Sequence, residues 1–539
     1  MIVDRERQIT SFVAEEYWSI EAELAKSRVK RRTKPDTFRA ALVGYLDKKD
    51  KLELHNKEET EGLVAELEGA RYHVGRVVVK DVPRHPAPPF ITSTLQQEAW
   101  RRFNFSAKRT MALAQQLYEG LPLGAEGPVG LITYMRTDST TVAASAVAET
   151  RAYISRKYGA DYLPRSPRRF TRKVKGAQEA HEAIRPTSVE REPQSLKSYL
   201  NRDQSRLYEL IWKRMVASQM ASAILKTTTV DVEARPQGMA PGYLFRARDS
   251  VVKFPGFIAL YGEGKDEAGD GEHPLPELSQ GELLELRGLY PEQHFTEPPP
   301  RYNEASLIRA LEENGIGRPS TYAPILSTIQ ERGYVEKEER RLKPTELGTI
   351  VSDLLTQHFA DIVDIGFTAQ MEEDLDQIAR GQREWVPVLQ EFYGPFAETV
   401  QRAALAMPRV KPAEEVTDQP CPECGRPMVI KYGRYGKFLS CPGYPQCRGA
   451  KPLLVSTGVK CPKCGGEVVE RRSKRGRRFY GCANFPKCDF ATWQRPLPQP
   501  CPKCGGLLHA YGRQGARCTQ CGYKGRARAV EKVPAAVGK

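Results

Sequence analysis

Cysteine is absent from the first 420 residues of this 539-residue chain, and several other features are missing from all of it. No run approaches the roughly 20 consecutive apolar residues that a membrane-spanning helix needs. The N-terminus, MIVDRERQITSF, lacks the basic start, apolar stretch and cleavage site of a secretory signal. No phosphate loop of the form GxxxxGKS or GxxxxGKT is present. These absences predict a cytoplasmic protein that has no membrane partner and does not hydrolyse ATP through such a loop.

Positive charge is in slight deficit in the first part of the chain and in large excess after it. The whole chain carries a net charge of +15. Residues 421–539 hold 24 Lys and Arg against 5 Asp and Glu, a net of +19, so residues 1–420 carry −4. Such a tail predicts a polyanionic partner such as nucleic acid, because neutralised phosphates release condensed counterions. The alternative is a tail that serves only solubility.

All twelve cysteines fall into three groups of four, and successive groups begin 40 residues apart. Each group begins with CPxCG and closes with a second cysteine pair, a pattern that supplies the four soft ligands of a tetrahedral Zn²⁺. A module of about 40 residues cannot bury enough apolar surface to fold alone, so a metal would stabilise it. We therefore expect about three structural zinc ions, with disulfides as the alternative. The expected ligands are Cys421, Cys424, Cys441 and Cys447; Cys461, Cys464, Cys482 and Cys488; and Cys501, Cys504, Cys518 and Cys521.

Before the cysteine modules, the chain alternates between β-rich and helical stretches. Four segments alternate in period two and are rich in β-branched and aromatic residues, which predicts strands: EYWSIEAELA, GRVVVKDV, TTTVDVEA and GYLFRARDSVVKF. A helical block from about 94 to 220, with Thr94 and Ser106 as predicted helix caps, lies between them. One β domain would therefore be built from two separated pieces. The proline-rich, charged stretch Pro408 to Pro420 is typical of a linker.

The segment GPVGLITYMRTDST, residues 127–140, is an apolar strand that ends in a polar cluster. A phenol such as that of Tyr134 ionises near pH 10, so it needs a positive environment to act as a nucleophile. Arg136 supplies this charge and can hold two phosphate oxygens at once. Asp138 and Ser139 would orient Arg136 or simply form a turn. On composition alone, Tyr134 would be a core tyrosine.

A second polar segment, GAQEAHEAIRPT, spans residues 176–187. His181 and Arg185 lie four residues apart and share a face if the segment is helical. A histidine can hydrogen-bond a phosphate in either protonation state, although a structural histidine is the alternative. The preceding segment RSPRRFTRKVK, residues 165–175, predicts a DNA-binding strip or else a solvated loop. The arginines of this strip include Arg168 and Arg169.

A third segment, GIGRPSTYA, begins at residue 315. Its glycines allow close backbone approach, and a guanidinium and two hydroxyls stand at an expected helix start. These groups, Arg318, Ser320 and Thr321, suit binding to single-stranded DNA. Further on, FTAQMEEDLDQIARG (residues 367–381) carries acidic side chains whose expected role is structural.

GLITYMRTDST is similar to the active-site signature of the type IA DNA topoisomerases, in the form found in bacterial topoisomerase I, and the other two segments also resemble that family. The resemblance implies a multidomain α+β fold in which helical domains and a β-rich hinge domain form a toroidal gate followed by three zinc ribbons. It implies that Tyr134 attacks a DNA phosphorus and forms a 5′-phosphotyrosyl bond, with Arg136 and His181 as catalytic partners. Strand passage and religation would then relax negatively supercoiled DNA of the nucleoid without ATP.

The resemblance also implies the domain boundaries. Residues 1–30 would be the remainder of a first helical domain, 31–93 with 221–297 the hinge domain, 94–220 the domain of Tyr134 and 298–407 a helical domain that binds single strands. A linker at 408–420 would lead to zinc ribbons at 421–457, 458–498 and 499–539.

The family also has a TOPRIM domain with a glutamate and an acidic cluster for Mg²⁺, and these residues are not in this sequence. Asp374 and Asp376 form a D-x-D pair, but inside an expected helix. We therefore expect a fragment, or one part of a split enzyme with a separate TOPRIM polypeptide, that is inactive or impaired alone. The alternative is a non-catalytic module that binds single-stranded DNA and stacks bases on ribbon aromatics. The ribbons would otherwise dock on a protein such as RNA polymerase. The expected stacking residues are Tyr435, Phe438, Phe479, Tyr480, Tyr511 and Tyr523.

Overall fold

In the computed structural model the chain divides into two compact units, Met1–Pro408 and Arg409–Lys539. No helix in the described part is both long and apolar enough to cross a membrane. The described residues are 1–27, 37–47, 52–170, 181–238, 242–262, 275–408, 415–433, 436–452, 455–472, 478–511 and 515–526.

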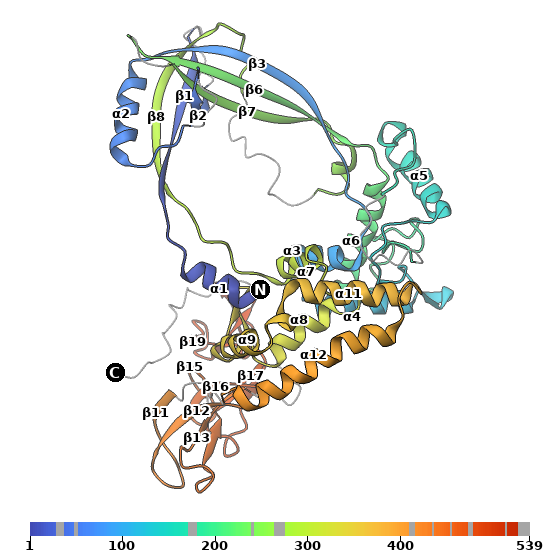
Figure 1. The fold of residues 1–539 in the computed structure, drawn as a ribbon, viewed down its shortest axis with the longest axis vertical. Coiled ribbons are helices and arrows are strands. Elements are labelled where there is room, and N and C mark those ends of the chain that lie inside the picture. Colours follow the sequence, from blue (N-terminus) through green and yellow to red (C-terminus); the bar gives the residue numbers. More distant parts are fainter. Residues whose placement is uncertain are drawn as a thin grey trace. The chain divides into compact units, whose positions relative to one another are not determined.

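Six antiparallel strands of the first unit close into a barrel in the order β1-β2-β7-β6-β3-β8 (Figure 1). The four segments predicted as strands lie in β1, β3, β6 and β7, which confirms that prediction. Alternate residues of β1, including Ile20, Ala22 and Leu24, are buried in the barrel core, as the two-residue period of a strand requires. The strands are β1 (Glu16–Lys26), β2 (Thr37–Tyr45), β3 (Arg71–Arg84), β6 (Ala223–Arg235), β7 (Tyr243–Phe254) and β8 (Leu283–Phe295).

Helix α2 (Lys57–Glu68) packs against this barrel. It begins after Asn56, whose side chain accepts a hydrogen bond from the Glu59 N–H at 2.9 Å. Leu63 and Leu67 of α2 belong to the barrel core. The barrel therefore combines strands that precede and follow the helical block in the sequence.

The helical block has a core of its own, to which Leu117, Tyr208, Ile211 and Met215 contribute. Ser106 caps its second helix as predicted, because its hydroxyl accepts from the Arg109 N–H at 3.2 Å. Thr94 does not cap the first helix, which begins two residues earlier. Its elements are α3 (Thr92–Phe103), α4 (Ala107–Glu119), β4 (Leu121–Pro122), η1 (Gly124–Glu126), β5 (Pro128–Val129), α5 (Ala144–Tyr158), η2 (Ala160–Tyr162) and α6 (Arg202–Ser218).

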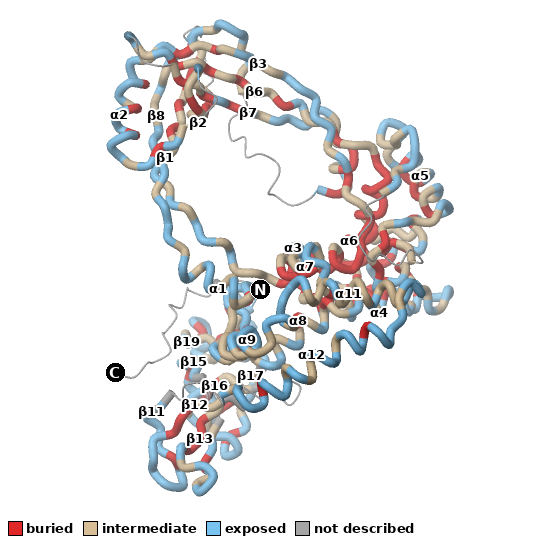
Figure 2. Tube along the Cα trace, in the orientation of Figure 1, coloured by how far each residue is buried: buried red, intermediate tan, exposed pale blue. Residues whose placement is uncertain are grey.

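The last part of the first unit is helical, with one two-stranded sheet. Asn303 and Ser306 form a reciprocal capping box at the start of α7, with 2.8 Å between each backbone nitrogen and the opposite side-chain oxygen. Buried residues concentrate in the barrel and in α3 to α6, whereas α9 to α12 are mostly exposed or half-buried (Figure 2). The remaining elements of this unit are α1 (Ile2–Thr10), η3 (Gly256–Ala259), α7 (Glu304–Glu313), α8 (Tyr322–Glu331), β9 (Val335–Glu338), β10 (Arg341–Pro344), α9 (Glu346–His358), α10 (Ala360–Val363), α11 (Ile365–Ala379) and α12 (Trp385–Ala406).

The second unit contains three four-stranded antiparallel sheets, each with its strands in sequence order. Every sheet carries one of the three cysteine groups. The strands are β11 (Glu415–Pro420), β12 (Pro427–Gly433), β13 (Gly436–Ser440) and β14 (Ala450–Pro452); β15 (Val455–Lys460), β16 (Glu467–Arg472), β17 (Arg478–Cys482) and β18 (Ala491–Thr492); and β19 (Pro496–Pro500), β20 (Leu507–Tyr511), β21 (Gly515–Cys518) and β22 (Lys524–Arg526).

Candidate functional site

The segment that carries Tyr134 is hydrogen-bonded to the end of α4 and packs closely against it. The short hairpin β4–β5 turns the chain back, and the Leu131 N–H then donates to the Leu117 carbonyl at 2.7 Å. At Gly130 a Cβ atom would lie 2.8 Å from the Tyr118 carbonyl oxygen, so only glycine permits this approach. Leu131 itself is fully buried. The segment that leads to Tyr134 is therefore held rigidly against the core.

From Tyr134 onward, side chains alternate between surface and core. Tyr134 and Arg136 are exposed, whereas Met135 and Thr137 are almost fully buried. The Thr92 hydroxyl at the start of α3 donates to the Met135 carbonyl at 2.7 Å and also lies 2.9 Å from the Thr137 nitrogen, whose N–H donates to it. This anchoring directs the phenol and the guanidinium to the same exposed face of an otherwise buried segment.

His181 lies beside Tyr134, with 5.5 Å between the two ring centroids. The ring of Tyr118 also lies beside Tyr134, with 5.4 Å between the ring centroids and 68° between the ring planes. Tyr134 is 37% exposed to solvent. Within the part of the chain that the structure describes, no hydrogen bond or ion pair engages the Arg136 guanidinium. A phosphate near Tyr134 would therefore meet an open phenol, an imidazole and an available cation.

The segment that carries His181 and Arg185 is extended from residue 181 onward, which overturns the helical arrangement considered for it; residues 176–180 lie outside the described part. Thr133 donates two hydrogen bonds to the backbone of this segment: its N–H donates to the Arg185 carbonyl at 2.9 Å, and its hydroxyl donates to the Ala183 carbonyl at 2.7 Å. The physical reason is this pairing, together with Pro186, which disfavours helical backbone at the residue before it. His181 thus approaches Tyr134 through strand-like pairing and not through a shared helix face.

Arg185 points into the protein, and only 12% of its side chain is exposed. Its Nε donates to Glu182 at 2.6 Å, and the same carboxylate accepts from the Ala143 N–H at 3.2 Å. Burial raises the pKa of Glu182, but the hydrogen bonds from Arg185 and Ala143 outweigh it and hold this pKa below its usual value. In this geometry Arg185 supports the segment of His181 and is not open to DNA.

The two arginines of the basic strip have different surroundings. The Arg168 guanidinium donates to the Met220 carbonyl at 2.9 Å and to the Ser222 hydroxyl at 2.7 Å, and its burial lowers its pKa. Arg169 is exposed. The strip beyond Phe170, with its remaining basic residues, lies outside the described part. Of this pair, only Arg169 is open to a phosphate in the structure.

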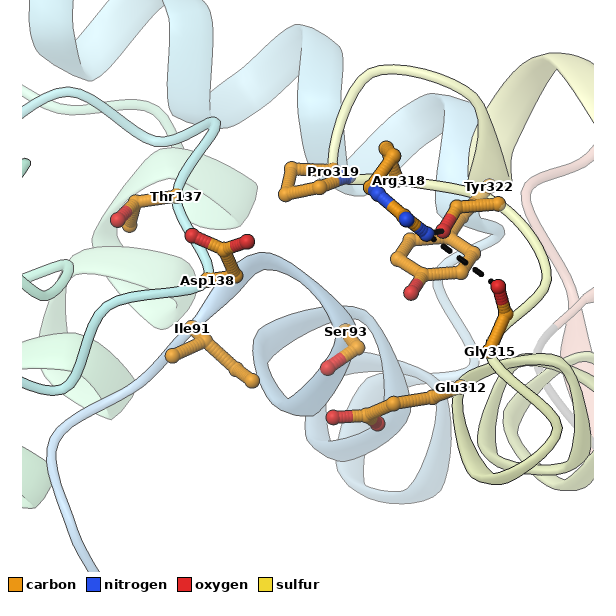
Figure 3. Close-up of a pocket in the computed structure, with 10 residues that line it drawn as sticks. Ile91, Ser93, Thr137, Asp138, Glu312, Gly315, Arg318, Pro319 and Tyr322 are labelled. Atoms are coloured by element: carbon orange, nitrogen blue, oxygen red, sulfur yellow. Dashed lines mark hydrogen bonds between the residues drawn. The ribbon is translucent and has the colours of Figure 1, made fainter. Parts of the chain in front are cut away.

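Arg318 lines a small pocket between the start of α3, the loop after Arg136 and the α7–α8 connection (Figure 3). Its guanidinium donates to Asp376 at 2.8 Å and to the Gly317 carbonyl at 2.9 Å. Burial lowers the pKa of Arg318, but the hydrogen bond to Asp376 and the charge of Glu372 raise it further than burial lowers it. The lining residues are Ile91, Ser93, Thr137, Asp138, Glu312, Gly315, Gly317, Arg318, Pro319 and Tyr322.

The hydroxyls expected beside Arg318 also differ from one another. Thr321 precedes α8, and its hydroxyl accepts from the Arg318 N–H at 2.8 Å, so it stabilises the turn. Ser320 is exposed. On α11, Asp374 receives a hydrogen bond from Arg383 at 2.6 Å, while Asp376 holds Arg318. The acidic residues of this helix therefore act as partners of arginines, which agrees with the structural role expected for them.

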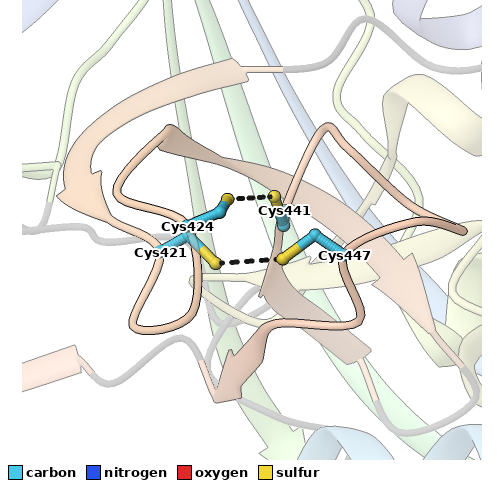
Figure 4. Close-up of side chains that lie close together, drawn as sticks. All are labelled: Cys421, Cys424, Cys441 and Cys447. Carbon is cyan, nitrogen blue, oxygen red and sulfur yellow. Dashed lines mark hydrogen bonds between the residues drawn. The ribbon is translucent and has the colours of Figure 1, made fainter.

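In each cysteine group the four sulfur atoms lie close together, all within 4.8 Å of one another. In the first group the Sγ atoms of Cys424 and Cys441 are 3.3 Å apart and those of Cys421 and Cys447 are 3.6 Å apart (Figure 4). Sulfur atoms bound to one tetrahedral Zn²⁺ would be separated by about 3.8 Å, so the groups fit zinc. A hydrogen bond from the Glu423 backbone N–H lowers the pKa of Cys421, whereas burial raises the pKa of Cys441 in the same group.

The aromatic residues of the ribbons are exposed to different degrees. Of the expected stacking residues, Tyr511 is 47% exposed, the others that the structure describes are half-buried, and Tyr435 lies outside the described part. Three other aromatic residues are more exposed than these: Tyr444, Phe485 and Trp493, at 64%, 60% and 67% exposure. The sequence does not single out these three, which lie in turns or bends outside the strands.

Comparison with known proteins now identifies the class. A family model described as DNA topoisomerase matches residues 1–390, and one described as topoisomerase DNA binding C4 zinc finger matches residues 418–455 and 458–496. The structure of full-length topoisomerase I from Thermotoga maritima is 33% identical to this chain, with a TM-score of 0.62, and the match covers 88% of this chain and 71% of that one. The chain is thus a DNA topoisomerase by fold. It belongs to the type IA family, with the α+β architecture expected from its sequence.

Two residues at the site are not evident from the sequence. Tyr118 ends an amphipathic helix, and nothing in the local pattern places its ring against Tyr134. Thr92 stands two residues before the predicted cap Thr94, and its role depends on contacts more than 40 residues away. A signal for Tyr118 was available in its neighbour Leu117: when one is buried in an amphipathic helix, the next residue points outward.

Proposed function

We propose that this chain carries the strand-cleaving site of an ATP-independent type IA DNA topoisomerase that relaxes negatively supercoiled DNA, with Tyr134 as the nucleophile. One observation carries the proposal. Tyr134 projects from a buried, hydrogen-bonded segment into the open, in ring contact with His181 and with Tyr118, and two residues from the exposed Arg136. Rigid elements that present an open nucleophile beside a cation are what a phosphoryl-transfer site needs.

The chemistry exchanges one phosphodiester bond for another. The Tyr134 oxygen attacks a backbone phosphorus, the 3′-oxygen of the preceding nucleotide leaves, and a 5′-phosphotyrosyl bond replaces the one that breaks. The phenol proton is lost as the 3′-oxygen gains one. After another strand has passed, the 3′-hydroxyl attacks the phosphotyrosine and reverses both changes. Arg136 binds the non-bridging oxygens, whose negative charge grows as the phosphorus becomes five-coordinate, and His181 hydrogen-bonds the same phosphate.

The described residues do not fit the Mg²⁺ that the family uses. In the part of the chain that the structure covers, the clusters able to hold a metal are the three cysteine groups, whose soft ligands suit zinc and not magnesium. The D-x-D pair Asp374 and Asp376 is engaged by arginines. We infer that the acidic groups for Mg²⁺ belong to a TOPRIM domain, on a preceding segment or on a separate polypeptide. No step above depends on the metal.

The zinc ribbons would bind the single strand that leaves the gate. Their exposed aromatic rings provide stacking surfaces, and the net charge of +19 in residues 421–539 attracts phosphates. Zinc would hold the four thiolates of each ribbon and thereby stabilise its small sheet. Docking of a ribbon on RNA polymerase would use the same exposed surfaces.

The test is a search for a covalent adduct. The chain is incubated with labelled single-stranded DNA and Mg²⁺, with and without a TOPRIM polypeptide, and denatured before electrophoresis. We expect an adduct that Tyr134→Phe abolishes and that Tyr199→Phe, at another exposed tyrosine, leaves intact. An adduct that persists in Tyr134→Phe would refute the assignment. Salt-sensitive DNA binding without an adduct under either condition would support the non-catalytic alternative.

A further inference from the structure

Tyr118 stands beside the proposed nucleophile without an assigned role. It lies in the last turn of α4, is 40% exposed, and its ring meets that of Tyr134 at 5.4 Å with 68° between the ring planes. Edge-to-face contacts of this kind are attractive because the positive edge of one ring meets the negative face of the other. Two open tyrosines therefore share one contact at the edge of the site.

The position of Tyr118 is fixed by the core and not by the surface. Its helix buries Leu113, Ala114 and Leu117 in the central cluster of the helical block. The hydrogen bond between the Leu131 N–H and the Leu117 carbonyl, and the close approach at Gly130, tie the end of this helix to the segment of Tyr134. The distance between the two tyrosine backbones is thus set by a short and rigid connection.

Two aromatic rings contact the ring of Tyr134 and restrict its rotation. Tyr118 lies at a centroid distance of 5.4 Å with 68° between the ring planes, and His181 at 5.5 Å with 33°. A tyrosine that is 37% exposed would otherwise sample several rotamers, each with a different direction of its oxygen. In-line attack on phosphorus needs one direction, and small displacements of a reacting atom reduce rates strongly.

We propose that Tyr118 is a positioning residue that holds the ring of Tyr134 in the orientation for attack on the DNA phosphate. The inference rests on the proposed function, in which Tyr134 is the nucleophile. It predicts that the ring of Tyr118 matters and that its hydroxyl does not, because the contact is between the two aromatic rings. It also predicts an effect on the rate of strand cleavage and not on the affinity for DNA.

The experiment compares Tyr118→Ala, Tyr118→Phe and the control Tyr199→Ala in the full chain, with the TOPRIM polypeptide present. Single-turnover adduct formation on labelled single-stranded DNA is measured at saturating protein, and DNA affinity is measured separately. We expect Tyr118→Ala to slow cleavage roughly three- to tenfold, the factor that corresponds to an aromatic pair of this type. Tyr118→Phe should restore the rate, and the Kd for DNA should be unchanged in all variants.

The outcomes separate the inference from the function beneath it. If Tyr118→Ala weakens DNA binding and leaves the saturated cleavage rate unchanged, Tyr118 is a DNA contact and the positioning role is wrong. If the wild-type chain forms no adduct, the proposed function fails, and a second readout still decides the inference. For that readout 3-fluorotyrosine replaces Tyr134, and its ¹⁹F resonance should shift and sharpen in Tyr118→Ala but not in Tyr118→Phe. An unchanged resonance in Tyr118→Ala would overturn the inference.

Discussion

The buried carboxylate of Glu304 joins two parts of the first unit that are far apart in sequence. Its side chain is 3% exposed, and it accepts a hydrogen bond from the Ala107 N–H at 2.8 Å and another from the Lys337 ammonium group. Ala107 is the first residue of α4, and the N–H groups in the first turn of a helix have no partner within the helix. We predict that Glu304→Ala destabilises the first unit far more than the loss of a surface ion pair.

The magnitude follows from what each partner of Glu304 loses. Ala107 is 2% exposed, so its N–H would stay buried without an acceptor, at a cost of roughly 1–3 kcal/mol. Loss of a negative charge at the start of α4 adds about 0.3–1 kcal/mol. Lys337 is 40% exposed and returns to water at little cost. We therefore expect a loss of about 2–3 kcal/mol for Glu304→Ala. For Glu304→Gln, which keeps an acceptor for Ala107, we expect roughly half that loss.

The neighbouring residue supplies a matched control. Lys108 pairs with Glu331 at 2.9 Å, and the two side chains are 71% and 67% exposed. Glu331→Ala should change stability by less than about 0.5 kcal/mol, because solvent screens such pairs. Urea unfolding of the chain is followed together with hydrogen exchange of the peptide that begins α4, since several units unfold separately. Equal effects of Glu304→Ala and Glu331→Ala would refute the reasoning.

Two further predictions concern charges near the site. Because the pKa of Glu182 is lowered in the folded protein, its contribution to stability is present above the unfolded carboxyl pKa and is lost as the pH falls through the lower folded value. Arg185→Ala should flatten this acid dependence in unfolding measured between pH 3 and 6, a window around the pKa of about 4.3 of an unfolded glutamate. Arg169→Ala should weaken DNA binding and reduce its salt dependence. Arg168→Ala should mainly lower the melting temperature, because its guanidinium donates to the Met220 carbonyl and the Ser222 hydroxyl. The reverse pattern in binding and melting assays would contradict the geometry.

Features with local causes could be predicted from the sequence. The ligands of each zinc group come in pairs separated by a few residues, and the structure brings all four sulfurs together. The two-residue period of the strands depends only on the pleat of the chain, and it placed β1, β3, β6 and β7 correctly. The Ser106 cap is itself a local interaction, although the distant Glu304 also stabilises the start of this helix. In each case the decisive interaction spans few residues.

Features with distant causes could not be predicted in this way. Thr94 has the pattern of a cap, yet α3 begins at Thr92, whose hydroxyl donates to the carbonyls of Met135 and Thr137. The segment of His181 has a helical spacing, yet its backbone pairs with Thr133. A local pattern lists which groups a residue offers, and the tertiary fold decides which partner takes them.

The same distinction applies to the arginines of the site and narrows the search for DNA contacts. The sequence offers several guanidiniums near the three motifs as equal candidates for phosphate. In the structure Arg168, Arg185 and Arg318 already donate to carbonyls, a hydroxyl or carboxylates, and drawing them to DNA would leave those partners without a donor. Arg136 and Arg169 can bind phosphate without that cost. A strand cleaved at Tyr134 should therefore meet Arg136 first, since it is the available cation two residues from the phenol.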